Sequence, residues 1–322
     1  MAKDWRNFEE QAQLLKQRGI QADSTAEIAR FLRKVNYYRF SGYFRYWQQD
    51  PANGENRFFR GTAFDDLKRL YDAEHVFTQA CAGMLHAIEV LLRNQFAFAY
   101  SKHFGTTGAF TLGEGFTQSP NPKELRVEQY VLRDLDRSKE KFVTHYRPKA
   151  TARNSKGACT YEHMPIWAAV EAFTFGTLSR LIEASGDSGV LDTMAEEMKI
   201  SRRYLPGQVR SFVYLRNRIA HCSRVWNHLV LEKPGMNRNV QRRAQKSYRN
   251  FADNSVYKIC VALSDVASKT DIADNWLGNT IEPILQSNKL LAAGITHPAK
   301  YGDLNSEFYT VLQQHLAQHL AK

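Results

Sequence analysis

The sequence predicts an all-α protein. Apolar residues recur at steps of three and four over several long segments, which is typical of amphipathic helices. Alternating β-branched runs, the usual signal of strands, are rare. With 322 residues, of which 43% are hydrophobic and 12% aromatic, the chain can bury a sizeable core. These observations together favour a helical bundle.

The first part of the chain contains one well-marked helix and a long apolar region. Ser24 and Glu27 have the spacing of a capping box, which predicts a helix over residues 24–35. The apolar pattern of residues 63–103 fits either two helices or one long, broken helix.

Further helices are expected after residue 105. A loop rich in Gly and Pro spans residues 105–122, and a charged, solvent-facing helix is expected at about residues 123–142. Pro165 begins another helix, which Gly176 interrupts. Residues 256–267 form a last clear amphipathic pattern.

We divide the chain into three regions: a helical and aromatic segment that packs on the core (1–60), the main helical domain with basic loops (61–270), and a helical extension (271–322). The four cysteines form no Cys-x-x-Cys pair, so we expect free thiols in a reducing compartment. No apolar run of about 18 residues and no secretory signal occur, which favours a cytoplasmic protein without a membrane segment.

Positive charge is concentrated in residues 201–250. This segment holds 12 Lys or Arg and one acidic residue, Glu232, and so accounts for the whole net charge of +11. Such a density suits a polyphosphate partner, such as RNA. The basic residues expected to contact RNA here are Arg210, Arg218, Arg224, Arg238, Arg242, Arg243 and Lys246.

A second candidate RNA-binding segment is Asn36–Trp47. Seven of its twelve residues are aromatic, and Arg39 and Arg45 lie among them. The rings and guanidinium groups could stack on unpaired bases and contact phosphates. The alternative is that the rings pack in the core, with Arg39 and Arg45 still available as contacts.

The most informative run is Arg216-Asn217-Arg218-Ile219-Ala220-His221. Its surroundings predict a helix with one buried apolar stripe, made of Phe212, Leu215, Ile219, Cys222 and Trp226. The opposite, polar face contains Arg210, Tyr214, Asn217, His221, Arg224 and His228. Arg216 lies at the edge of this face, so that one helix can present a cation, an amide and an imidazole to one anion.

These three groups are suited to cleavage of an RNA phosphodiester by its own 2′-hydroxyl. Imidazoles titrate near neutrality, so His221 could move the protons. Arg216 could clamp phosphate oxygens through two donors, and Asn217 could orient the imidazole or the phosphate. No acidic cluster or His-x-x-x-His pattern accompanies them, so no metal or other cofactor is required. The alternative is a solvated or dimer-contacting helix face.

Four ordered motifs give the chain a family resemblance. They are Asn36–Tyr43, Ile88–Asn94 with Phe104–Gly105, His163–Trp167 with Glu171 and Phe175–Leu178, and Arg216–Asn217 through Trp226–Asn227. Over about residues 10–290 the chain resembles the Abi-D/Abi-F (Abi-like) family of bacterial abortive-infection proteins, within the HEPN superfamily.

The resemblance implies a HEPN-type helical bundle with additional N- and C-terminal helices. It also implies a ribonuclease site at Arg-x4-His, which corresponds here to Arg216, Asn217 and His221, formed where two such helices meet in a homodimer. Similar proteins act as toxins in phage defence, and some are restrained by a small structured RNA. Cys222 stands where many of these proteins have a second histidine.

The leading hypothesis is therefore a metal-independent endoribonuclease toxin that cuts cellular RNA to 2′,3′-cyclic phosphate ends and is restrained by a cognate small non-coding RNA. One alternative is a protein that binds structured RNA without cleaving it. Another is an interaction module of a defence complex, with residues 36–47 as its docking surface.

Overall fold

The computed structural model describes residues 4–147 and 161–298, together with residues 313, 314 and 317. Over these residues the chain is built of helices, apart from a small antiparallel sheet of β1 (Gln48–Asp50) and β2 (Glu55–Phe58), in which Gln48 lies opposite Phe58. The prediction of an all-α fold is confirmed.

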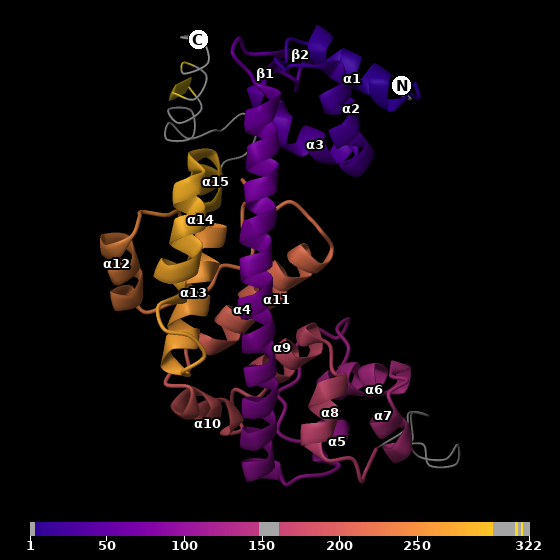
Figure 1. Ribbon diagram of the computed structural model, residues 1–322. Coiled ribbons are helices and arrows are strands. Elements are labelled where there is room, and N and C mark those ends of the chain that lie inside the picture. Colours follow the sequence, from indigo (N-terminus) through magenta and orange to yellow (C-terminus); the bar gives the residue numbers. More distant parts are fainter. Residues whose placement is uncertain (1–3, 148–160, 299–312, 315–316, 318–322) are drawn as a thin grey trace.

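One unbroken helix, α4 (Phe64–Phe104), organises the molecule (Figure 1). Its 41 residues correspond to about 60 Å. Residues 63–103 therefore form one long helix, and the break predicted within them is wrong. By length and composition alone α4 could cross a membrane. In the structure it packs against α8, α10, α11 and α13 and buries residues along its whole length.

The N-terminal elements gather at one end of α4 (Figure 1). They are α1 (Phe8–Gln17), α2 (Thr25–Lys34), α3 (Tyr37–Phe44), a 3-10 turn (Arg45–Trp47) and the β1–β2 hairpin. The predicted cap is present at the start of α2, where the Ser24 side chain accepts a hydrogen bond from the Glu27 amide at 3.2 Å.

The other end of α4 is covered by six shorter helices: α5 (Ala109–Leu112), α6 (Val127–Arg137), α7 (Lys141–Tyr146), α8 (Ile166–Ala172), α9 (Phe175–Ala184) and α10 (Val190–Glu197). The single charged helix predicted at residues 123–142 is wrong. The chain breaks at Ser138, because Arg147 donates to the carbonyl groups of Leu135, Asp136 and Ser138 and holds the turn. Val131 and Leu135 of α6 are buried, so this helix is not simply solvent-facing.

The interruption predicted at Gly176 lies instead two residues earlier. Thr174 begins α9, accepting a hydrogen bond from the Thr177 amide at 3.1 Å. The buried carboxylate of Asp134 accepts from the Thr174 amide at 2.8 Å, which fixes the start of α9 against α6. Gly176 therefore lies in the first turn of α9 and does not break a helix.

The C-terminal part comprises α11 (Leu205–Ala220), α12 (Arg238–Ser247), α13 (Val256–Lys269), a π-helical turn (Leu277–Ile281), α14 (Glu282–Ser287) and α15 (Lys289–Thr296). The helix predicted at residues 256–267 is confirmed as α13. No clear apolar pattern predicts α12, because only Val240 and Ala244 of this helix are buried.

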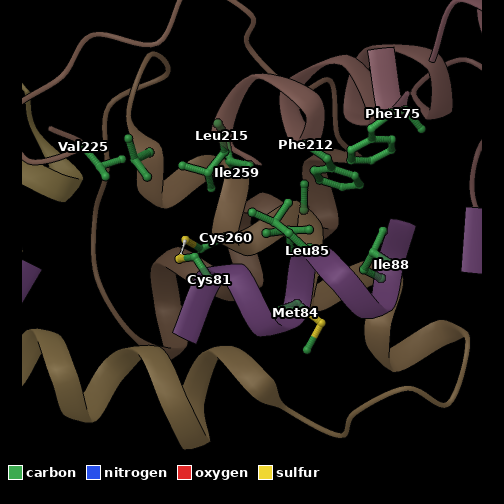
Figure 2. Close-up of a cluster of buried hydrophobic side chains, with 14 of the residues drawn as sticks. Cys81, Met84, Leu85, Ile88, Phe175, Phe212, Leu215, Val225, Ile259 and Cys260 are labelled. Atoms are coloured by element: carbon green, nitrogen blue, oxygen red, sulfur yellow. Dashed lines mark hydrogen bonds between the residues drawn. The ribbon is translucent and has the colours of Figure 1, made fainter. Parts of the chain in front are cut away.

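The core where α4, α11 and α13 meet fixes the position of α11 (Figure 2). Leu85 and Ile88 of α4 face Phe212 and Leu215 of α11, with Ile259 of α13 beside them. The buried sulfur atoms of Cys81 and Cys260 lie 3.9 Å apart as free thiols, and Cys222 is free and exposed. The expectation of free thiols is confirmed for these three residues, whereas Cys159 lies outside the described residues.

Candidate active site

The motif helix α11 ends at Ala220, so the predicted continuation of the helix to residue 228 is wrong. His221 is the C-cap residue and Cys222 adopts the left-handed conformation, with a φ of 51°. The Cys222 amide donates to the Ile219 carbonyl at 2.9 Å, and the Ser223 amide donates to the Arg218 carbonyl at 2.8 Å. This is the Schellman ending of a helix, with cysteine where glycine is usual.

Buried contacts beyond the turn explain why the chain leaves the helix there. The Glu74 carboxylate of α4 accepts from the amides of Val225, at 2.5 Å, and Trp226, at 2.8 Å, and also from the Tyr43 hydroxyl. The Trp226 ring stacks on Tyr43 and Trp47, with centroid distances of 5.8 and 6.1 Å. If α11 continued past Ala220, residues 225 and 226 could not make these contacts. Arg224 and His228 therefore lie outside the helix and are not part of its polar face.

Burial decides whether the rings of Asn36–Trp47 pack in the core or lie exposed for stacking on bases. Five of its seven rings are buried: Phe40, Tyr43, Phe44, Tyr46 and Trp47. Core packing is therefore correct for these five rings. Tyr38 differs, with 86% of its surface exposed.

Arg216 projects from α11 toward α4, where it meets a carboxylate. Its Nε and Nη2 atoms donate to Glu89 at 3.1–3.2 Å, in a two-pronged ion pair. The guanidinium also lies 5.6 Å from the Phe175 ring centroid. Because 35% of the Arg216 side chain remains exposed, the cation is positioned but still accessible.

Glu89 is shared between two arginines. The i, i+4 spacing of Glu89 and Arg93 predicts an ion pair on the helix surface, and the pair is present at 2.6 Å. It is not on the surface, because only 13% of Glu89 and 11% of Arg93 are exposed. Arg93 also donates to the carbonyl groups of Val170, in the last turn of α8, and Phe173, in the α8–α9 connection. Through Glu89, that connection and α4 together position Arg216.

Asn217 and His221 lie one turn apart at the exposed end of α11. The Asn217 side-chain oxygen accepts from Arg216 Nη1 at 3.1 Å. The His221 amide bonds to the Asn217 carbonyl at 3.0 Å, and the imidazole is exposed. The structure thus brings the predicted cation and amide into contact and leaves the imidazole exposed one helical turn from Asn217.

Tyr214 and His228 contact each other although His228 has left the helix. Their rings stack with a centroid distance of 5.9 Å, and the Tyr214 hydroxyl bonds to the His228 Nε2 atom. Burial, followed by the nearby positive charges of Arg218 and Arg224, lowers the pKa of His228 to about 4. This histidine is therefore neutral at pH 7 and does not share the chemistry proposed for His221.

Several arginines predicted to contact RNA are engaged within the protein. Arg39 bonds to the Cys222 carbonyl and to the Tyr71 hydroxyl, which joins α3 to the turn after α11. Arg224 bonds to the Gly42 carbonyl and lies 5.5 Å from the Tyr46 ring. Arg218 donates to the Arg224 carbonyl. These three side chains hold the motif turn in place.

The other basic residues predicted to contact RNA lie at separate places on the surface. Arg210 is exposed and pairs with Glu183 at 2.8 Å, and Arg45 is exposed near the N-terminal end. The remaining four are exposed on α12, which packs on α13 rather than on α11 (Figure 1): Arg238, Arg242, Arg243 and Lys246. The positive charge of residues 201–250 is thus spread over α11, α12 and the segments beside them.

Sequence reasoning missed two carboxylates that position the motif. Glu89 holds Arg216 and Glu74 holds the chain after His221, yet they are 127 and about 150 residues away from their partners. An available signal was that both are acidic residues within a strongly apolar helical pattern, where a carboxylate needs a partner. Among the described residues, no group of three or more His, Cys, Asp or Glu side chains could hold a metal ion.

The model of the family described as Abi-like protein matches residues 30–227, which is more than half of the chain. The protein therefore belongs to the Abi-like family, which connects it with abortive infection, a form of phage defence. No curated protein and no solved structure matches the chain.

Proposed function

We propose that this protein is a metal-independent endoribonuclease of the HEPN type that acts as a toxin in phage defence. The observation that carries the proposal is the geometry around Arg216. Glu89 holds the guanidinium through two-pronged bonding, Asn217 contacts it, and His221 is exposed one turn away. Membership of the Abi-like family supports the role in defence.

The proposed reaction requires two proton transfers and the neutralisation of a dianionic phosphorane. A base removes the proton of the ribose 2′-hydroxyl, whose oxygen attacks the adjacent phosphorus. The bond from phosphorus to the 5′-oxygen breaks, and an acid protonates that oxygen, leaving a 2′,3′-cyclic phosphate. In a two-fold homodimer one His221 serves as base and its mate serves as acid, while Arg216 neutralises the phosphate oxygens.

The test is cleavage of total cellular RNA in EDTA by purified wild-type and variant proteins. We expect His221→Ala and Arg216→Ala to lower cleavage by about a hundredfold or more, the range expected for loss of general acid–base or phosphate-binding groups. His145→Ala, which removes an exposed histidine of α7, is the matched control and should cleave normally. Wild-type cleavage in either site variant would refute the proposed roles.

A second candidate function, binding of a structured RNA without turnover, is favoured by the exposed basic face of α12. Its residues Arg238, Arg242 and Lys246 lie at helical spacing on the side opposite the buried Val240 and Ala244. We propose that a small structured RNA in the cytoplasm contacts this face. Binding should then weaken steeply with salt, and triple alanine substitution should lower affinity without creating or removing RNA ends.

A further inference from the structure

A groove runs beside the motif along the polar face of α11. Its volume is about 790 Å³, a size typical of small-molecule sites. Arg210, Val213, Tyr214 and Asn217 of α11 line one side of it. The other sides come from α9, from residues 117–125 and from the first turn of α6.

The groove is continuous with the candidate active site. Asn217 lines it and also accepts the hydrogen bond from Arg216. The α11 residues from Arg210 to Asn217 span about 10 Å at the rise of an α-helix. A strand whose phosphate lies at Asn217 and His221 would therefore place one or two neighbouring nucleotides along this groove.

Part of the groove surface is flat and apolar. The Arg180 guanidinium lies 4.5 Å from the Tyr130 ring centroid, so that these two planar groups form one side. Leu125, which is exposed, and Val213 add apolar surface. Planar and apolar surfaces of this kind stack on unpaired bases, whichever base is present.

The charges in the groove disfavour a phosphate and favour a base. Three carboxylates, Glu124, Glu183 and Glu232, line it with only two arginines, Arg180 and Arg210. Arg210 is itself paired with Glu183 at 2.8 Å and lies 3.8 Å from Glu232. A phosphate here would be repelled, whereas a base that presents N–H donors can bond to a carboxylate.

We propose that this groove binds the nucleobase next to the scissile phosphate, and that Glu183 selects guanine there. Guanine presents two adjacent N–H donors, at N1 and N2, on its Watson–Crick edge, which match the two oxygens of a carboxylate. The Glu183 oxygen that accepts from Arg210 has a second lone pair for one of these donors. Adenine presents only its amino group on that edge, and uracil a single N–H. The inference rests on the proposed ribonuclease function and adds to it a sequence preference at one position.

The test is to map the new 5′-hydroxyl ends that wild-type protein creates in a library of random single-stranded RNA. We expect guanine to be preferred over adenine at one position flanking the cut by about tenfold, in the range of a two-bond base contact. Glu183→Gln should reduce that preference to about threefold or less, because the amide replaces one acceptor by a donor. Arg180→Ala should slow cleavage at all sequences through loss of stacking.

Glu197→Gln, an exposed and isosteric change on α10 outside the groove, is the matched control. Circular dichroism and thermal unfolding check that each variant is folded. Wild-type cleavage without a base preference beside the cut, or an equal preference in Glu183→Gln, would overturn this inference and leave the proposed function standing. Failure of the wild type to cleave any RNA would overturn both.

Discussion

Replacing Glu89 by glutamine tests whether one carboxylate of α4 positions the arginine of the motif. Glutamine keeps the size of the side chain but removes the negative charge between Arg93 and Arg216. Arg93 retains its bonds to the carbonyl groups of Val170 and Phe173, whereas Arg216 retains only its bond to Asn217 and its contact with the Phe175 ring. We therefore expect Arg216 to be the side chain that moves.

The loss of stability expected for Glu89→Gln follows from the solvent exposure of the two ion pairs that Glu89 makes. Removing one partner of a buried ion pair costs about 3–5 kcal/mol, whereas exposed pairs contribute about 0–1 kcal/mol. The pair of Glu89 with Arg93 is nearly buried, and Arg216 is 35% exposed. We expect Glu89→Gln to lower the free energy of unfolding by about 3 kcal/mol, with the larger part due to Arg93.

Denaturant unfolding of single and double variants measures the two parts separately. A double-mutant cycle of Glu89→Gln with Arg216→Met should give a coupling of about 1 kcal/mol, and the cycle with Arg93→Met about 2–3 kcal/mol. Folded Glu89→Gln protein should cleave RNA at least about tenfold more slowly, since Arg216 is no longer aligned. Unfolding and cleavage both equal to wild type would refute the reasoning.

Three further predictions concern stability. Gly294→Ala should lower the free energy of unfolding by about 1–3 kcal/mol, because the new Cβ would lie 2.2 Å from Trp226 Nε1. Gly83→Ala should instead raise the free energy of unfolding by about 0.5–1 kcal/mol, because its new Cβ would meet nothing within 4 Å. Since the folded protein lowers the pKa of His228 to about 4, only the unfolded chain binds this proton between about pH 6.5 and pH 4. Unfolding free energy should therefore fall as pH falls through that window, by about 1–2 kcal/mol after allowance for solvent at this half-buried site, and His228→Gln should flatten the slope. Cys222→Gly should raise the unfolding free energy by about 0.5–1 kcal/mol in denaturant titrations, because the left-handed φ of 51° suits glycine; a decrease would contradict the strain argument.

Short-range sequence patterns correctly predicted the helices whose ends and faces depend on neighbouring residues. The cap of Ser24 on the Glu27 amide and the pattern of residues 256–267 depend on neighbours within a turn or two, and both predictions are confirmed. The same kind of signal misplaced the break near Gly176, because the turn is set by Asp134 of another helix. It also missed α12, whose apolar stripe is narrow.

For the candidate site, the sequence alone determined which groups are present and that Asn217 and His221 are one turn apart, since helical spacing is a local property. Tertiary structure decided that the helix ends at Ala220, that Arg216 is held by Glu89, and that most of the aromatic segment packs in the core. The first two outcomes, and the packing of the Tyr43, Tyr46 and Trp47 rings on Trp226, depend on partners more than a hundred residues away along the chain. Burial removes water as the alternative partner for a polar group, so the packing of distant helices chooses its contacts.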